Sequence, residues 1–192
     1  METIRSLPAR LYPQILGTAW YDLDEAVQRL HGEPATVRAT GTFRVRHGAN
    51  WLARLLVRLA GLPAAGEAVE VQLAVIPRDH GEEWRRAFAG RLLVSFQWQR
   101  PDGLLAEQMG LLELWFRLEV AGGMLIYHPQ RAALRLGSLR LPLPRWCAPR
   151  VAAWEKPVGD GESTQVSVEV SLPLLGLLVA YEGTLTGIEA QK

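Results

Sequence analysis

The sequence predicts a mainly β protein of the α+β class, in which about ten antiparallel strands form a strongly curved sheet or a barrel. Apolar and polar residues alternate with a period of two from Val37 almost to the end of the chain, as strands with one buried face require. Turn signals such as Asp79-His80-Gly81 and Pro101-Asp102-Gly103 separate the short apolar runs. The length of 192 residues, of which 48% are hydrophobic, suits a single domain over 1–192.

The first 34 residues (1–34) are expected to form a helical segment that packs on the sheet. Apolar residues recur there every three or four positions, which is the spacing of one helix face. A second helix is predicted to begin near Asp22, because Asp22 and Glu25 have the spacing of a capping box. Gly32 and Pro34 end that helix, since neither residue favours its continuation.

One further helix is predicted between the first strand and the rest of the sheet. The first strand starts at Val37 and ends near Val45, and Asn50 then provides an N-cap. The helix runs over 51–60 and ends at Gly61. Its apolar stripe comprises Trp51, Leu52, Leu55, Leu56 and Leu59. A helix in this position is placed to act as a lid over the sheet.

The strands after this helix follow one another with short turns, as in an antiparallel sheet or barrel. In the run 91–99 the residues Leu92, Val94, Phe96 and Trp98 share one face, and the two aromatic rings are expected to point inward. The expected strands are 69–75, 83–88, 91–99, 104–109, 112–120, 124–128, 132–136, 151–155, 164–171 and 177–186.

Composition and charge exclude several classes of protein. Lysine and arginine total 21 against 20 acidic residues, so the net charge of +1 creates no global field that favours nucleic acid as a partner. Cys147 is the one cysteine, and it can form neither an internal disulfide nor a Cys-rich metal site. No apolar run reaches the ~18 residues of a membrane-spanning helix, and the first residues lack the apolar core of a secretory signal. We therefore expect a soluble, cytoplasmic protein without a transmembrane segment.

Arginine supplies 19 of the 21 basic residues. Two interpretations remain open, bidentate recognition of anions and the coding bias of a GC-rich genome. The five arginines between positions 131 and 150 are not interrupted by a single acid. Two alternatives remain for this stretch. It binds phosphate or an anionic membrane surface, or it forms a solvated face that pairs with the acidic tail 151–192.

The motifs of common enzyme chemistries are missing from the sequence. It contains no G-x-x-x-x-G-K-[ST] loop, no G-x-G-x-x-G turn and no G-x-S-x-G nucleophile elbow. The sharpest metal candidate is His80 with Glu82 and Glu83, but adjacent residues of a strand point to opposite faces, which favours a solvated turn. No catalytic residue, metal site or cofactor is predicted.

Charged residues on otherwise apolar strands are better candidates for a site. Arg86 lies two residues from Trp84 and therefore shares its face of the strand, where the guanidinium can stack on the indole. Glu107 is the one charge in 104–112 and would need a partner if it points inward. An Arg86–Glu107 pair inside the sheet would either anchor the polar head of a ligand or form a structural ion pair. The remaining alternative is that both charges are exposed.

Several motifs resemble a bacterial domain family of unknown function over nearly the whole chain. The matching motifs are Leu11-Tyr12, Leu30-His31-Gly32, Trp84-Arg85-Arg86-Ala87-Phe88, Ser95, Glu107-Gln108-Met109-Gly110, Leu139–Pro144, Pro149, Glu155, Leu172-Pro173-Leu174-Leu175-Gly176, Tyr181 and Gly183. In that family the domain often sits at the C-terminal end of a Rossmann protein that is similar to saccharopine dehydrogenases or epimerases. The resemblance implies a separate Rossmann-type oxidoreductase as a partner, and it implies no catalytic residues.

Two functional hypotheses compete. The first is a carrier or sensor that binds an apolar small molecule or lipid in an internal cavity of at least ~300 Å³, and the lack of such a cavity would overturn it. The second is a non-catalytic module that docks on a Rossmann-type oxidoreductase or associates into a homodimer. An enzyme that uses Glu107 with Arg86 ranks last, because no nucleophile, base and orienting group can be assembled. The candidate ligand-binding residues are Trp84, Arg86, Phe96, Trp98, Glu107 and Tyr181.

Overall fold

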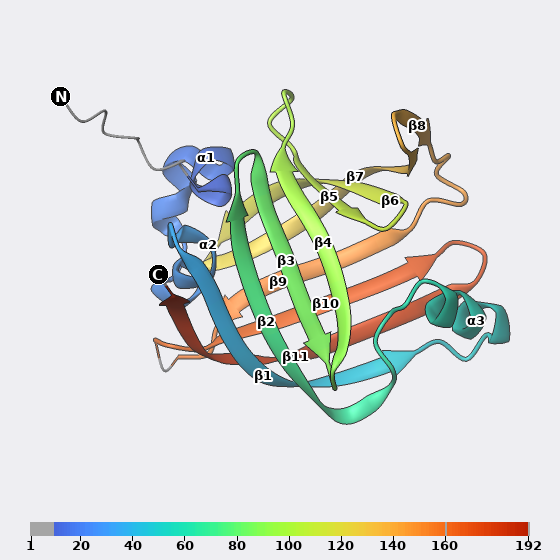
Figure 1. Cartoon of the computed structure of the whole chain (residues 1–192), viewed down its shortest axis with the longest axis horizontal. Coiled ribbons are helices and arrows are strands. Elements are labelled where there is room, and N and C mark those ends of the chain that lie inside the picture. Colours follow the sequence, from blue (N-terminus) through green and yellow to red (C-terminus); the bar gives the residue numbers. More distant parts are fainter. Residues whose placement is uncertain (1–9, 160, 192) are drawn as a thin grey trace.

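Ten antiparallel strands close into a barrel in the computed structural model, which describes residues 10–159 and 161–191 (Figure 1). The ring order is β1-β2-β3-β4-β5-β6-β7-β9-β10-β11, and β8 lies outside the ring as a hairpin partner of β7. The strands are β1 Thr36–His47, β2 Gly66–Arg78, β3 Gly81–Phe88, β4 Arg91–Gln99, β5 Leu105–Met109, β6 Leu112–Ala121, β7 Met124–Leu136, β8 Leu139–Pro142, β9 Arg150–Pro157, β10 Thr164–Leu172 and β11 Gly176–Gln191. The predicted mainly β fold is confirmed, and the sheet is a closed barrel.

Two pairings complete the ring. Strand β6 pairs with β7, and the first strand β1 pairs with the last strand β11. Each of the ten ring strands has a hydrogen-bonded neighbour on both sides, although the β4–β5 and β7–β9 pairings cover only four and three residue pairs. At the β1–β11 seam Phe43 lies opposite Gly183, where an added Cβ would come within 2.5 Å of the Phe43 ring. A glycine here lets the aromatic ring lie against the neighbouring strand.

The core of the molecule is the interior of this barrel. The apolar positions of the two-residue pattern point inward in most strands, as predicted. On β1 the buried members are Val37, Ala39, Phe43 and Val45, and on β2 they are Val71, Leu73 and Val75.

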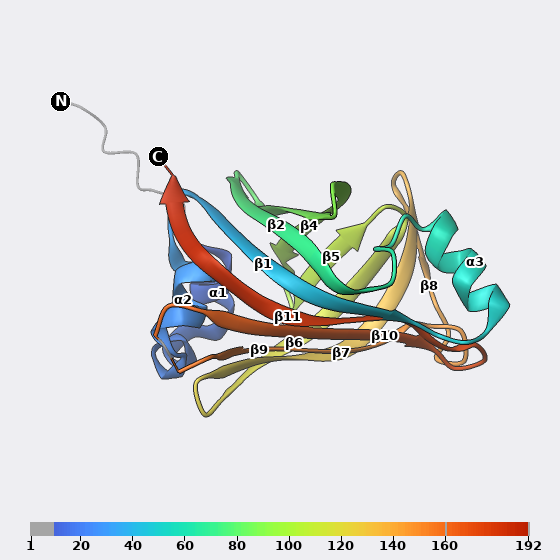
Figure 2. The ribbon, with the colours of Figure 1, turned by 90° about the horizontal axis from the view of Figure 1, so that it is seen from below.

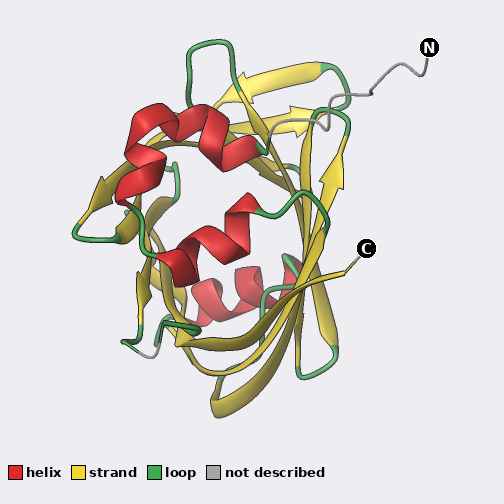
Figure 3. Ribbon diagram, turned by 90° about the vertical axis from the view of Figure 1, so that its left-hand side faces the viewer, coloured by secondary structure: helices red, strands yellow, loops and turns green. Residues whose placement is uncertain are grey.

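Two α-helices and a 3-10 helix cover one mouth of the barrel (Figure 3). They are α1 Leu11–Leu16, the 3-10 helix η1 Gly17–Asp22 and α2 Glu25–Gly32. The predicted helical segment 1–34 is thus found from residue 11 onward, while residues 1–9 lie outside the described residues.

The N-cap of α2 is Asp24, and the prediction of Asp22 is wrong. The Asp24 side chain accepts a hydrogen bond from the backbone N–H of Ala26 at 3.0 Å. Its own N–H donates to the carbonyl of Gly123 in the β6–β7 turn at 3.2 Å. That tertiary contact fixes where the chain enters the helix, and Asp22 instead ends the preceding 3-10 helix.

The remaining helix, α3 Trp51–Leu59, lies at the opposite end of the barrel (Figure 2). Its predicted N-cap is confirmed, since the Asn50 side chain accepts a hydrogen bond from the N–H of Leu52 at 2.9 Å. Its predicted apolar stripe does not face the barrel, because Ala53 and Val57 are the buried residues of the helix. Among the described residues, none of the helices has the length and apolar character needed to span a bilayer.

Candidate ligand-binding site in the barrel interior

The barrel interior contains a cavity of about 110 Å³. Its wall is mostly apolar and consists of inward-facing strand residues. Leu30 of α2 lines it at one end of the barrel, and Leu62 of the segment after α3 lines it at the other. Leu62 packs against both the main core and the small apolar cluster under α3. The volume is below the ~300 Å³ expected for a ligand site. In this conformation the cavity therefore has room for a small molecule but not for a drug-sized one.

Three polar side chains from neighbouring strands meet at the wall of this cavity. Arg86 of β3 donates from Nη1 to Oγ of Ser95 on β4 at 2.8 Å and from Nη2 to Oε1 of Glu107 on β5 at 3.3 Å. The Ser95 hydroxyl donates to the same Glu107 oxygen at 2.6 Å. No side chain of the described residues donates a hydrogen bond to Oε2 of Glu107. That oxygen can accept one from a molecule in the cavity.

Aromatic side chains surround this cluster. The guanidinium of Arg86 lies 4.8 Å from the ring centroid of Trp84, as the stacking prediction required. Burial alone would lower the pKa of Arg86, but the nearby Glu107 outweighs burial and the net pKa is raised. Burial raises the pKa of Tyr181 to about 12, although Arg86 acts in the opposite direction. Arg86 is therefore charged, and Tyr181 neutral, at neutral pH.

A second polar network joins the N-terminal helices to the barrel wall. His31 of α2 lies with Nε2 2.7 Å from Oε2 of Glu155 on β9, and Tyr127 of β7 donates to Oε1 of the same carboxylate at 2.8 Å. Tyr12 of α1 donates to the Gln97 side-chain oxygen at 2.8 Å, and its hydroxyl lies 3.1 Å from that of Tyr127. The network connects α1 and α2 to β4, β7 and β9 inside the core.

Burial and charge together set the protonation of this network. Burial would raise the pKa of Glu155, but its contacts with His31 and Tyr127 hold the pKa below its ordinary value. Burial, reinforced by the charge of Glu155, raises the pKa of both Tyr12 and Tyr127 well above the ordinary tyrosine value. At neutral pH the network therefore contains an ionised Glu155 carboxylate, to which the neutral Tyr127 hydroxyl donates, and a neutral Tyr12 hydroxyl.

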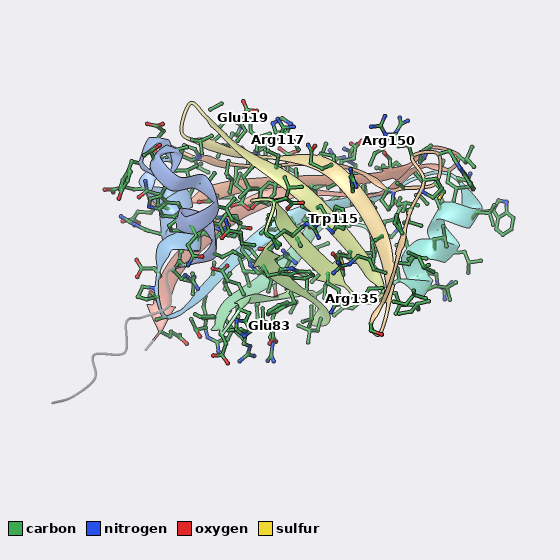
Figure 4. All side chains as sticks on the ribbon, turned by 90° about the horizontal axis from the view of Figure 1, so that it is seen from above. Glu83, Trp115, Arg117, Glu119, Arg135 and Arg150 are labelled. Carbon is green, nitrogen blue, oxygen red and sulfur yellow. The ribbon has the colours of Figure 1, made fainter. Side chains whose placement is uncertain are left out.

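Glu82 forms a buried ion pair beside this network, so the expectation that it belongs to a solvated turn is wrong. It is 1% exposed, and its Oε1 lies 3.4 Å from Nη1 of Arg10. Burial raises the pKa of Glu82 although Arg10 opposes the shift, and burial lowers the pKa of Arg10. The adjacent Glu83 points to the outer face, where it pairs with Arg78 and Arg85 (Figure 4). The two neighbouring carboxylates therefore lie on opposite faces, as predicted.

Four of the six candidate ligand-binding residues line the cavity, namely Trp84, Arg86, Glu107 and Tyr181. The prediction that Phe96 and Trp98 point inward is wrong. Their rings stack on each other at 5.8 Å between centroids on the outer face of β4. The inner face of that strand instead carries Leu93, Ser95 and Gln97. This inner face is the more polar one because Ser95 belongs to the Arg86–Glu107 cluster and Gln97 accepts a hydrogen bond from Tyr12.

Sequence reasoning missed most members of the network below the helices. Tyr12, His31 and Glu155 occur in the motifs that resemble the family, but no pairing between them was predicted. A usable signal was Glu155, which is the one charged residue in the run 151–155 of an otherwise apolar strand. Its partner His31 lies 124 positions away, so no spacing rule connects the two residues.

Fold and site define a closed antiparallel barrel with a small, mostly apolar cavity and a polar cluster on its wall. The chain belongs to the family described as a domain of unknown function, DUF4166, which matches residues 23–185. No curated protein matches the chain. A similar solved structure is a protein of unknown function of the DUF3598 family from Nostoc punctiforme, with 10% identity and a TM-score of 0.36. The match covers 79% of this chain and 46% of that one, so the chain spans about half the length of that protein.

Proposed function

We propose that the barrel interior binds one small apolar molecule that carries a hydrogen-bond donor, such as a hydroxyl group. The observation that carries this proposal is the Glu107 carboxylate, which has one oxygen held by Arg86 and Ser95 and the other left for a donor in an apolar cavity. Ligand sites combine apolar walls with a few fixed polar groups in this way. Trp84 and Tyr181 would contact the apolar part of the ligand.

The cavity does not meet the ~300 Å³ that the carrier hypothesis required, so the ligand we propose is smaller than the lipid or drug-sized molecule expected from the sequence. An apolar cavity of about 150 Å³ is enough for benzene, and the cavity here measures about 110 Å³. A complete lipid or a drug-sized molecule would need the barrel to expand. The ligand we propose is therefore a compound of a few carbon atoms, or the slender end of a longer one.

The first experiment is native mass spectrometry of gently purified protein, followed by organic extraction. A discrete extra mass that disappears on extraction would support the proposal, and the extract would identify the chemical class of the ligand. The same spectrum reports whether the protein is a monomer or a homodimer.

A chain-length series then tests the cavity directly. Binding of n-alkanols is measured by calorimetry; affinity is expected to rise about fourfold for each added methylene until the cavity is full and then to fall. Val168→Phe, which places a ring in the cavity wall, should abolish binding. Glu107→Gln should weaken it, whereas the matched outer-face variant Glu83→Gln should not. Affinity that rises without a maximum, or that Val168→Phe leaves unchanged, would place binding outside the cavity.

A further inference from the structure

Helix α3 exposes its apolar side chains instead of burying them. Trp51 is 70% exposed and Leu59 is 76% exposed. The residues that pack onto the barrel are Ala53 and Val57, which contact Leu178. The surface helix of a globular protein ordinarily buries its apolar stripe and exposes its polar one. Here Trp51 and Leu59 at the two ends of the stripe are the most exposed, and the other stripe residues Leu52, Leu55 and Leu56 are 39–45% exposed.

Two other segments at the same end of the barrel also expose apolar side chains. The β10–β11 turn and the β7–β8 hairpin lie at the same end of the barrel as α3, opposite α1 and α2 (Figures 1 and 2). Leu174 in that turn is 75% exposed, and Trp146 after the hairpin is also exposed. We call this region the α3-end surface, defined by Trp51, Leu55, Leu59, Leu139, Trp146 and Leu174. Exposed apolar side chains that gather into a patch mark surfaces that bind proteins or membranes.

The segments that form the α3-end surface contain more arginines than acids. Two acids lie next to them: Glu67, which pairs with Arg44, and Glu169 of β10, which is exposed and lies opposite Ala152 and Ala180. The stretches 48–66, 131–154 and 171–181 together hold seven arginines and neither aspartate nor glutamate. In Figure 4 Arg135 and Arg150 lie in the half of the barrel nearer α3, whereas Arg117 and Glu119 lie side by side in the half nearer the N-terminal helices. Apolar side chains are thus combined with positive charge at one end of the molecule.

Several of these arginines have no acidic partner within the protein. No carboxylate of the described residues forms an ion pair with Arg58, Arg145 or Arg150. A second copy of the chain is a poor partner for this surface, because a two-fold contact would place arginines against arginines. A surface that offers both acidic headgroups and an apolar layer is complementary to it.

We propose that the α3-end surface binds an anionic lipid membrane. The side chains of Trp51 and Leu59 would enter the interface between headgroups and acyl chains, and the arginines would contact acidic headgroups. This inference goes beyond the proposed function, and it does not depend on it, since the α3-end surface lies on the outside of the barrel. Membrane binding can therefore be measured without any ligand in the cavity.

The test is sedimentation of the full chain with vesicles of phosphatidylcholine, either alone or with one third phosphatidylserine. Binding is expected only to the vesicles with phosphatidylserine, and the double variant Trp51→Ser/Leu59→Ser should abolish it. Arg58→Gln/Arg145→Gln should weaken it about 25-fold, at about fivefold for each arginine. The matched variant Tyr21→Ser/Arg29→Gln removes an exposed aromatic ring and an arginine at the other end, and it should bind as the parent does.

Three outcomes would overturn the proposal. The first is an absence of binding to both kinds of vesicle, and the second is equal binding to both. The third is a homodimer, or a complex with a Rossmann-type oxidoreductase, that forms with the parent chain and is lost in Trp51→Ser/Leu59→Ser. That third result would assign the α3-end surface to a protein partner. Circular dichroism of each variant confirms that any lost binding is not lost folding.

Discussion

The two ends of the barrel differ in which side chains they bury and which they expose. At the end covered by α1 and α2, charged and hydroxyl side chains such as Glu155, His31 and Tyr12 are buried and hydrogen-bonded to one another. At the α3 end, apolar side chains such as Trp51 and Leu59 are exposed. The covered end therefore buries polar side chains together with leucines such as Leu30, whereas the α3 end leaves large apolar side chains exposed.

This difference predicts that substitutions at the covered end change mainly the free energy of unfolding, whereas substitutions at the α3 end change mainly what the surface binds. Buried polar networks lose much stability when one member is removed, because the remaining groups are left without partners. Exposed apolar residues add little to stability and therefore need another explanation, such as a binding surface. Substitutions at the two ends should accordingly differ both in size and in the property that changes.

The largest effect is expected for Glu155→Ala. It removes the partner of both His31 and Tyr127 in the core, so the free energy of unfolding should fall by about 3–5 kcal/mol. Urea denaturation followed by circular dichroism measures the change. Glu119→Ala is the matched control, since the His128–Glu119 pair has the same 2.7 Å distance but is exposed. That control should lose at most ~1 kcal/mol; equal losses in the two variants would contradict the comparison.

A smaller loss is expected for Tyr12→Phe, which deletes one hydroxyl and keeps the ring. The side-chain oxygen of Gln97 is left without its donor in the core, and unfolding should become easier by about 1–3 kcal/mol. Tyr181→Phe is the matched variant, because no described residue forms a hydrogen bond with the Tyr181 hydroxyl. Denaturation curves in which Tyr181→Phe is the more damaging change would show that the network is not what stabilises the capped end.

Lowering the pH should reduce the stability of the end covered by α1 and α2, because Glu155 becomes protonated. The pKa of this carboxyl is lower in the folded protein than its ordinary value of 4.5, so the stability it adds is present above that pH. That stability is lost as the pH falls through the lower, folded-state pKa. Glu82 acts with the opposite sign, because its raised pKa favours the folded state as the pH falls. Stability measured from neutral pH down to about pH 3 should therefore fall less steeply in Glu155→Gln than in the parent.

The barrel was predictable because alternation and turn signals are local properties. The inner and outer faces of β1 and β2 follow from the pattern of residues such as Val37 and Leu73, since their two faces differ strongly in polarity. On β4 the same reasoning failed. Its inner face carries Ser95 and Gln97, whereas its more apolar face, with Phe96 and Trp98, points outward. The rule that the more apolar face is buried therefore gives the wrong orientation for this strand. Periodicity identifies two faces, but only the partners across the fold decide which one is buried.

The candidate site was partly predictable for the same reason. Arg86 and Glu107 stand out as charges on apolar strands, and the pair between them follows from the need for a partner. Ser95, which completes the cluster, has no such signal because a serine can be satisfied almost anywhere. The network of His31 and Glu155 depends on closure of the ring and docking of α2, which no local pattern encodes.

The smallest effect on the free energy of unfolding is expected for the exposed residues of α3, and the buried face of the same helix provides the comparison. Trp51→Ser and Leu59→Ser remove exposed side chains and should change the free energy of unfolding by no more than ~0.5 kcal/mol each. Val57→Ala, on the buried face of the same helix, should cost about 1–2 kcal/mol. Thermal and urea denaturation of the three variants test this order. If Trp51→Ser were as damaging as Val57→Ala, the apolar stripe would be part of the fold, and its exposure would no longer argue for a membrane surface.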